Sequence, residues 1–357
     1  MEFIMENAIK KQEEKSGKET NIGQANIKVV GCGGAGCNMC DWLYEKGIQG
    51  AKIISMNTDT QHLESREADR KVLIGQDLTR GLGAGGYPEK GREAAKESIQ
   101  QIKEVVQDTD MIFITAGMGG GTGTGSAPVV AQIAKEAGSI VIGVVTMPFN
   151  IERARIDKAE FGLKQLRKTC DTVIVIDNNR LVDIAGNLPI GQAFAVANEL
   201  VSTMIKGIVE TIAVPSLVNL DYADVKAIMT NGGVSVIGIG ESDTENKVTE
   251  AVTRALSNPL LDVKYAGADG ALIHISGGAD LTLEEVQKVG EMVTQSLDAD
   301  ANVIWGARVH NDMAGKIRVM TIITGVSSPY VLGKKEVGKP SVQEVQLNEE
   351  LGIDTVR

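Results

Sequence analysis

The chain has 357 residues and a mass of 37.9 kDa, and because a single hydrophobic core rarely serves a chain of that length, we expect two domains. Its 36 Lys and Arg residues against 47 Asp and Glu residues leave a net charge of −11, which argues against nucleic acid as a partner. No apolar run approaches the roughly 18 residues that cross a bilayer, and the polar beginning of the chain does not resemble a signal peptide. We therefore expect a cytoplasmic protein that does not insert directly into membranes.

The first half of the chain alternates short β-branched segments with helical patterns. This alternation predicts a Rossmann-like α/β fold, in which helices cover both faces of a parallel sheet. The expected strands are residues 27–30, 51–56, 111–116, 139–147 and 172–177. From Ile190 to Ile212, just before Pro215, apolar residues recur at helical spacing and predict one long buried helix.

The pattern changes after that helix and predicts a second, smaller α+β domain. Its expected strands are residues 234–241, 271–276, 302–309 and 317–325, and its expected helices are residues 245–257 and 281–298. We divide the chain into a flexible or helical N-terminal extension (1–25), a nucleotide-binding domain (26–190), a central helix (191–215), a C-terminal domain (216–330) and a flexible tail (331–357). The tail ends in LGIDTVR, which is either a short docking peptide or an inert end.

Cys37 and Cys40 form a C-x-x-C motif, which on its own fits zinc binding or redox chemistry. The chain has no second C-x-x-C, and its three histidines are scattered, so a tetrahedral zinc site lacks its remaining ligands. We expect reduced thiols packed on the first turns of a helix, and no metal held directly by side chains.

Two glycine-rich segments follow predicted strands. Residues 31–36 (GCGGAG) satisfy G-x-G-x-x-G, a pattern that is typical of dinucleotide sites but serves any nucleotide. Residues 116–125 (AGMGGGTGTG) contain more glycine than a simple connection would tolerate, because glycine costs chain entropy. They predict a nest of backbone N–H groups at a helix N-terminus around two or three phosphates, with Thr122 and Thr124 as hydroxyl donors.

The second loop contains no lysine and therefore differs from the Walker arrangement. The phosphate charge would then be offset by backbone amides, Mg²⁺ and a nearby arginine. A third cluster, residues 81–86 (GLGAGG), either closes over the terminal phosphate or is a mobile surface turn.

GGGTGTG at residues 119–125 resembles the signature of the tubulin and FtsZ superfamily. The order of the other motifs also resembles FtsZ over about residues 26–325: GCGGAGCN, NTD, GLGAGG, PFNIER, DNNR and NLDYADV. The segment NIERAR and the lack of a bacterial-type IPAFLRR tail make the chain similar to the second archaeal FtsZ type. The resemblance implies a cell-division GTPase that assembles into protofilaments at the division site at mid-cell, the Z-ring.

The resemblance also implies which residues bind GTP or GDP. Those expected around the phosphates and the adjoining part of the nucleotide are Gly33, Gly34, Asn38, Asn57, Asp59, Ala84, Gly85, Gly117, Met118, Gly119, Gly120, Gly121, Thr122 and Gly123. Glu152 matches the ribose-binding glutamate, and Arg155 stands one residue before the usual position of the pocket arginine. Asn178 and Asn198 match the positions that read guanine, while Phe194 either stacks on the base or packs only in the core.

Asn219, Asp221 and Asp224 follow the predicted long helix. By the resemblance, this loop enters the nucleotide pocket of the next subunit, where Asn219 contacts the phosphates and the two carboxylates orient the attacking water. The partner is then a second copy of the chain in a head-to-tail polymer, with Mg²⁺ held mainly by phosphates and water. The tail is expected to bind a membrane-tethering adaptor.

Two other functions are open from the sequence. An NAD-linked dehydrogenase would use the G-x-G-x-x-G segment and Asp59, although no histidine stands in a suitable place for a proton relay. A GTP-binding scaffold without useful catalysis would also need the glycine loops, but the presence of both Asp221 and Asp224 argues against it.

Overall fold

The computed structural model describes residues 25–213, 218, 222–230, 233–257, 268, 270–298 and 300–326. The N-terminal extension up to residue 24, the tail 331–357, and two expected catalytic residues, Asn219 and Asp221, lie outside the described residues. Within the described part of the chain, every helix is too short or too polar to cross a membrane.

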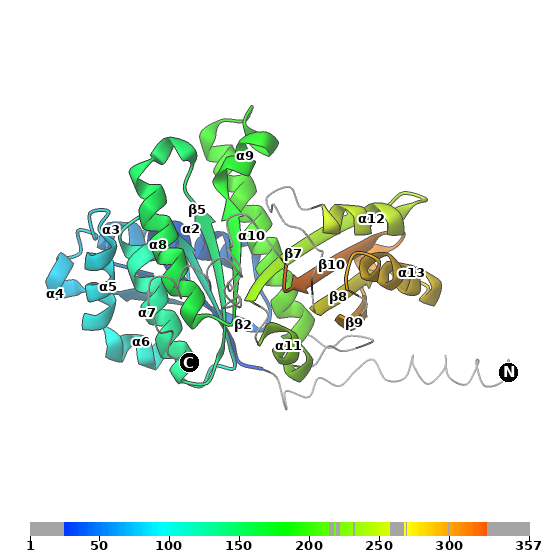
Figure 1. Cartoon of the computed structure of the whole chain (residues 1–357), viewed down its shortest axis with the longest axis horizontal. Coiled ribbons are helices and arrows are strands. Elements are labelled where there is room, and N and C mark those ends of the chain that lie inside the picture. Colours follow the sequence, from blue (N-terminus) through cyan, green and yellow to red (C-terminus); the bar gives the residue numbers. More distant parts are fainter. Residues whose placement is uncertain are drawn as a thin grey trace, which may run out of the picture.

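The described strands form one sheet in the order β3-β2-β1-β4-β5-β6-β7-β10-β8-β9 (Figure 1). The parallel half contains β1 (Ile27–Cys32), β2 (Ala51–Asn57), β3 (Arg70–Leu73), β4 (Met111–Gly117), β5 (Ile140–Met147) and β6 (Thr172–Asp177). The mixed half contains β7 (Gly233–Ser242), β8 (Gly270–Gly277), β9 (Asn302–Val309) and β10 (Ile317–Thr324). The halves join where Thr172 and Val173 of β6 pair in parallel with Gly233 and Val234 of β7.

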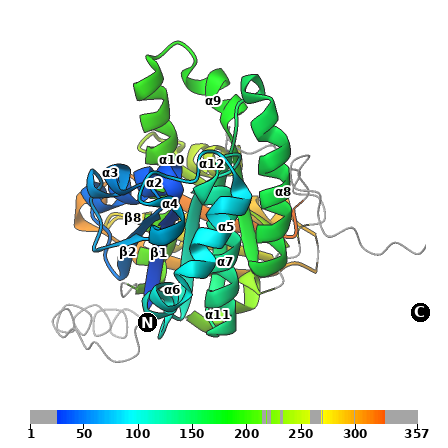
Figure 2. The same ribbon diagram turned by 90° about the vertical axis from the view of Figure 1, so that its left-hand side faces the viewer.

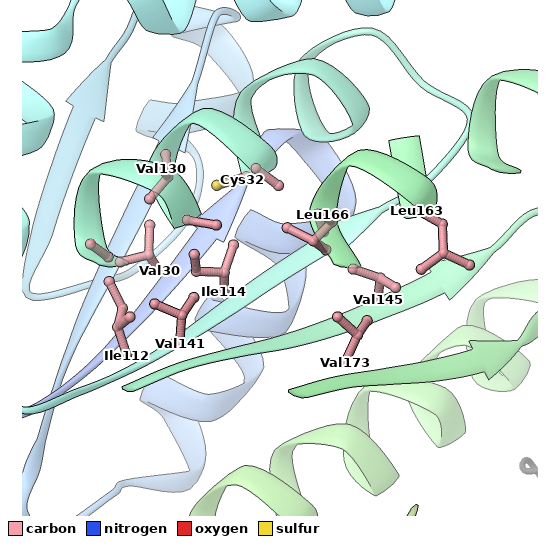
Figure 3. Packing of buried hydrophobic residues seen from close by; sticks show 14 of the residues in the cluster. Val30, Cys32, Ile112, Ile114, Val130, Val141, Val145, Leu163, Leu166 and Val173 are labelled. Carbon is pink, nitrogen blue, oxygen red and sulfur yellow. The ribbon is translucent and has the colours of Figure 1, made fainter. Parts of the chain in front are cut away.

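Alternate side chains of the parallel strands face two helix layers, because successive residues of a strand point to opposite faces of the sheet. On one face, strand residues such as Val30 and Ile114 pack against α7 and α8 (Figure 3). On the other face, Val29 and Phe113 pack against α2 and α10. The helices of the first layer are α5 (Pro88–Glu97), α6 (Ile99–Val106), α7 (Thr122–Glu136) and α8 (Ala154–Thr169), and those of the second are α2 (Gly33–Lys46), α9 (Asn178–Ala185), α10 (Ile190–Ala213) and α11 (Tyr222–Met229).

The long helix α10 belongs to both halves of the molecule. Its residues Val201 and Ile208 share one apolar cluster with Phe113 of β4 and with Ile237 and Met320 of the mixed half. Two further helices, α12 (Lys247–Leu256) and α13 (Leu283–Thr294), cover the opposite face of the mixed half. The helix predicted from Ile190 to Ile212 is therefore confirmed.

The expected strands of both halves are also confirmed, whereas several short elements had no clear sequence signal. β3 is four residues long and buries only Val72, so no alternation of apolar and polar residues marks it. The short helices α3 (Thr60–Glu64) and α4 (Gln76–Thr79) each bury one side chain and likewise show no helical period. Glycines and alanines dominate the buried positions of α5, where small residues allow close contact with α7.

The buried ring of Phe113 tests how far the shared core stabilises the chain. Phe113 is 0% exposed in the middle of β4. Phe113→Ala should lower the free energy of unfolding by about 3–5 kcal/mol, because it removes apolar contacts and leaves a cavity. Urea unfolding followed by circular dichroism would measure this change. Phe161→Ala, at a ring that is 51% exposed, is the matched control, and an equal loss in both variants would contradict the expectation.

Candidate active site

Two glycine-rich loops leave the sheet side by side where the strand order reverses. β1 and β4 are neighbours, with Cys32 paired to Ala116. α2 begins within the first glycine-rich segment, at Gly33, and α7 begins within the second, at Thr122. The chain passes from β1 outward to β2 and later returns to β4 on the other side of β1. Ligands of open α/β sheets bind beyond the carboxyl ends of strands at such a reversal, and two helix N-termini there favour an anion.

Direct backbone contact holds these two loops together. Gly33 has φ of +71°, and a Cβ there would lie 2.6 Å from the backbone nitrogen of Gly123. A Cβ on Gly123 would in turn lie 2.9 Å from the carbonyl oxygens of Cys32 and Gly117. Neither position has room for a side chain, so both glycines are required by the packing.

The third glycine cluster closes onto the second loop. A Cβ on Gly121 would lie 2.8 Å from Cβ of Ala84 and 2.9 Å from the backbone nitrogen of Tyr87. The hydroxyl groups of Thr58 and Thr122 are 2.7 Å apart, which links the segment after β2 to the same loop. Three segments that are remote in sequence therefore meet at one end of the sheet.

Some glycines of this site face open space instead. A Cβ on Gly120 or on Gly86 would meet nothing within 4 Å, and one on Gly34 would meet only the His62 ring, at 3.7 Å. These positions leave the backbone accessible to a ligand. The loops thus combine contacts that fix their shape with a free surface of peptide groups.

Three groups that could be expected to bind phosphate are used inside the protein. The Gly119 N–H donates to Oγ1 of Thr124 at 2.9 Å, and Thr124 is only 2% exposed. The Met118 N–H donates to the Thr146 carbonyl of β5 at 2.9 Å. The expected role of Thr124 as an outward donor is therefore replaced by a role inside the loop, where its side chain holds the turn.

Polar residues from β2 and α2 border the first loop. Oδ1 of Asn57 accepts from the Thr58 N–H at 2.9 Å, and Asp59 caps α3 by accepting from the His62 N–H at 2.9 Å. Oδ1 of Asn38, on the first turns of α2, is buried and has no partner among the described residues. Buried acceptors are nearly always paired, so the Asn38 amide fits a donor that a ligand would bring.

His62 and Lys158 also lie at this site, although neither residue stands in a motif that predicted it. Burial and the nearby Arg66 lower the pKa of His62, which keeps the ring neutral beside Gly34. Nζ of Lys158, on α8, donates to the Gly86 carbonyl at 2.7 Å and lies 5.4 Å from the centroid of the Tyr87 ring. Only the folded chain brings α8 beside the third loop, so no local pattern could have identified this lysine.

Glu152 and Arg155 form an ion pair beside the second loop. Nη1 of Arg155 donates to Oε2 of Glu152 at 2.6 Å, and Oε1 of Glu152 accepts from the Phe149 N–H at 3.0 Å. A Cβ on Gly119 would lie 2.8 Å from the Arg155 carbonyl oxygen. Arg155 is thus next to the glycine loop despite its shifted place in the sequence.

The residues expected to bind the guanine base come from α9 and α10, which lie next to each other at the top of Figure 2. Asn178 is the first residue of α9 and Asn198 lies in α10, both partly exposed. The Phe194 ring, 41% exposed, meets the Phe149 ring edge-on with centroids 6.0 Å apart. A ring that keeps this much exposed surface is not explained by core packing alone.

Asp224 lies at the opposite end of the sheet from the glycine loops. It is the third residue of α11, whose first residue, Tyr222, donates its hydroxyl to the Asp110 carbonyl at 2.7 Å. Asp110 directly precedes β4, and Gly117 at the other end of β4 opens into the second loop. β4 has seven residues, so roughly 20 Å of strand separates the two ends.

The segment before the acidic loop is fixed to the edge of the mixed half. Val218 and Ala307 of β9 exchange two backbone hydrogen bonds, of 3.1 and 3.2 Å. Val218 directly precedes Asn219. Val218, before the acidic residues, is thus bonded to β9, and Tyr222, after them, begins α11.

The cysteines of the first loop are packed thiols. Sγ of Cys37 donates to the Met56 carbonyl at 3.5 Å, and Sγ of Cys40 donates to the Ile54 carbonyl at 3.6 Å. Burial raises the pKa of the Cys37 thiol to about 12, so the group stays protonated. The expectation of reduced, packed thiols is confirmed for this pair.

Comparison with known proteins identifies the family. The Tubulin/FtsZ family GTPase domain matches residues 26–186, and the FtsZ family C-terminal domain matches residues 233–327. Cell division protein FtsZ 2 of Methanocaldococcus jannaschii is 56% identical over 96% of this chain and 91% of its own length. Cell division protein FtsZ 1 of Thermococcus kodakarensis is 54% identical over 88% of this chain and 84% of its own length. The solved structure of an empty FtsZ dimer of M. jannaschii covers 90% of this chain and 92% of its own, with 50% identity and a TM-score of 0.79.

These matches confirm the family expected from GGGTGTG and the ordered motifs, and the relative named FtsZ 2 agrees with the expected archaeal type. The alternative of an NAD-linked dehydrogenase is wrong, because the first glycine loop lies within a matched GTPase domain. The three joined loops at one end of the sheet and the α11 carboxylate at the other thus belong to a chain of the FtsZ family of cell-division GTPases.

Proposed function

We propose that this chain binds GTP on the three joined loops and hydrolyses it when the next subunit of a protofilament adds Asp221 and Asp224. The observation that carries the proposal is the separation of the two ends of β4. Asp224 lies on the helix held at the amino end of that strand, and the glycine loops follow its carboxyl end. A carboxylate that far from the loops of its own chain reaches a phosphate only in a neighbouring copy.

The phosphate part of the site follows from the loops. Open backbone at Gly34, Gly86 and Gly120, with the N-termini of α2 and α7, offers N–H groups and positive dipole ends to phosphate oxygens. Oδ1 of Asn38, which has no partner among the described residues, would accept from a hydroxyl or N–H group of the nucleoside, because phosphate brings no donor. Glu152, paired with Arg155, would meet the ribose hydroxyl groups.

Guanine would be held between α9 and α10. An amide can accept from the N1–H and N2–H₂ groups of guanine and donate to O6, so Asn178 and Asn198 suit this edge. The exposed face of Phe194 would stack on the ring. Adenine presents the opposite arrangement of donors and acceptors and would leave these amides poorly paired.

In the hydrolysis step, the carboxylates of Asp221 and Asp224 would accept hydrogen bonds from the attacking water and orient it toward the γ-phosphorus. Their charge beside a phosphate is unfavourable unless a cation offsets it. Mg²⁺ would supply that charge, held mainly by phosphate oxygens and water. Among the described residues, no group of three or more His, Cys, Asp or Glu side chains forms a metal site.

The cellular setting follows from the family and from the tail. The chain would assemble head to tail into protofilaments at the mid-cell division site in the cytoplasm. A membrane-tethering adaptor would bind the C-terminal tail.

GTP hydrolysis per molecule should rise from near zero once the protein concentration passes a threshold, because half of each site comes from a neighbour. Phosphate release over a roughly hundredfold dilution series would measure this dependence. A rate per molecule that stays constant throughout the series would place the whole site in one chain.

Asn198→Ala should weaken GTP binding by roughly 5- to 100-fold and leave the weaker ATP binding almost unchanged, since it removes hydrogen bonds to the guanine edge. Competition of each nucleotide with a fluorescent GDP analogue would give both affinities. Gln192→Ala, at an exposed position of the same helix, is the control for effects on α10. Equal weakening of GTP and ATP by Asn198→Ala would remove its role in reading the base.

Two inactive variants should restore activity when they are mixed. Gly120→Trp puts a large side chain into the space expected for phosphate, at a position where a Cβ meets nothing within 4 Å, and it leaves the acidic loop unchanged. Asp224→Ala keeps an intact nucleotide site but should lose roughly 10² to 10³ in turnover. In mixed filaments, some interfaces join the good half of each variant.

The test is to measure phosphate release from each variant and from the mixture. Co-sedimentation would confirm that the two variants assemble together. Asp243→Ala, at another exposed carboxylate, should keep full activity alone. Mixed filaments whose activity is only the sum of the two residual rates would show that catalysis does not span two chains.

A further inference from the structure

A groove with a volume of about 750 Å³ is lined by residues of α5, α6, α7 and α8. Figure 2 shows these four helices together on one side of the sheet. The apolar surface of the groove includes Ile99, Val129 and Ile133, together with Phe161, whose side chain is 51% exposed. The ring of Pro128 also lines it. The groove thus offers apolar contact, as a site for a peptide would.

The groove is basic although the chain as a whole is acidic. Its lining contains four basic residues, Arg92, Lys96, Lys103 and Lys168, and only two acidic residues, Glu89 and Glu136. The chain as a whole carries a net charge of −11. Arg92 and Lys96 have Glu93 as a neighbour, but Lys103 and Lys168 make no ion pair with any described residue. An acidic ligand with apolar side chains is the chemistry that complements this surface.

We propose that this groove binds the acidic segment of the chain's own C-terminal tail, residues 341–354 (SVQEVQLNEELGID). The segment carries four carboxylates, at residues 344, 349, 350 and 354, and it contains no Lys or Arg. The apolar residues of the segment, which would contact the apolar surface, are Val342, Val345, Leu347, Leu351 and Ile353. Lys334, Lys335 and Lys339 precede this segment and Arg357 follows it, so residues 341–354 themselves are acidic without a basic residue.

The end of the described chain lies on the same side of the sheet as the groove. Ile323 and Val326 belong to the same apolar cluster as Val130 and Ile133 of α7. Fourteen residues, 327–340, connect Val326 to the acidic segment. A chain of that length spans up to roughly 45–50 Å when extended, and about 20 Å on average when flexible. Tethering also keeps the segment at a high local concentration, so weak contacts suffice for binding.

The proposal does not rest on the nucleotide chemistry. When the segment is docked in the groove, it would not be accessible to an adaptor that binds the tail. The groove would therefore hold the tail on the folded part of the chain until a stronger partner takes it.

Cysteine cross-linking in the full-length, GDP-bound chain tests the proposal. Val345→Cys is combined with Gln132→Cys, an exposed position in the groove, or with Glu284→Cys, an exposed position on α13. Under a mild oxidant at low protein concentration, the groove pair should form an intramolecular disulfide several-fold faster than the α13 pair. Equal rates for the two pairs, or a disulfide that joins two chains only, would overturn the proposal.

Charge reversal gives a second, independent measurement. Lys103→Glu with Lys168→Glu should slow the groove cross-link by roughly three- to tenfold, as expected for two or more surface ion pairs. Lys164→Glu, one turn away on α8 and outside the groove, should leave it unchanged. Adding Glu349→Lys and Glu350→Lys to the double reversal should restore the rate. A rate that ignores these charges, or no rescue, would show that the segment does not bind here.

Discussion

The backbone contact between Gly33 and Gly123 is the constraint on which the nucleotide site depends. Neighbouring parallel strands are only about 4.8 Å apart, so two loops that leave β1 and β4 together must share that narrow space. A single Cβ at position 33 would lie 2.6 Å from the facing backbone nitrogen. With no side chains between them, the two helices begin close to one another, and the dipole ends of α2 and α7 act on the same volume.

The parallel half of the sheet holds the glycine loops at one end and α11 at the other. Its strands are buried on both faces by helices, which leaves little freedom for one end to move relative to the other. The hydroxyl of Tyr222 attaches α11 to the amino end of β4, while the glycine loops depend on the carboxyl end. In the proposed function, head-to-tail contact would bring one end of this axis onto the other end of the next subunit without closing a ring.

Most of the sheet could be predicted because its buried strands are long runs of β-branched residues, such as MIFITA before the second loop. α10 could be predicted because it buries a continuous stripe over many turns. β3 could not, since an edge strand with one buried residue has no pattern. The single sheet that joins the two halves was not foreseen either, because only two residue pairs connect β6 with β7.

The glycine loops of the site could be recognised from their composition, but the direction in which each backbone N–H group points could not. Whether an N–H points outward depends on a hydrogen bond such as that from Gly119 to Thr124, which forms only in the folded loop. Lys158 shows the same limit, since its contact with Gly86 joins residues 72 positions apart. Spatial neighbours of this kind leave no local signal in a single sequence.

The pair of hydrogen bonds between Val218 and Ala307 has a consequence for solubility. β9 is the outermost strand of the mixed half, and an outer strand with free N–H and C=O groups invites pairing with other chains. Val218 occupies two of those groups directly before the acidic loop. Any movement that releases the start of the loop also uncovers part of the β9 edge, so an unanchored acidic loop would promote irregular side-by-side aggregation.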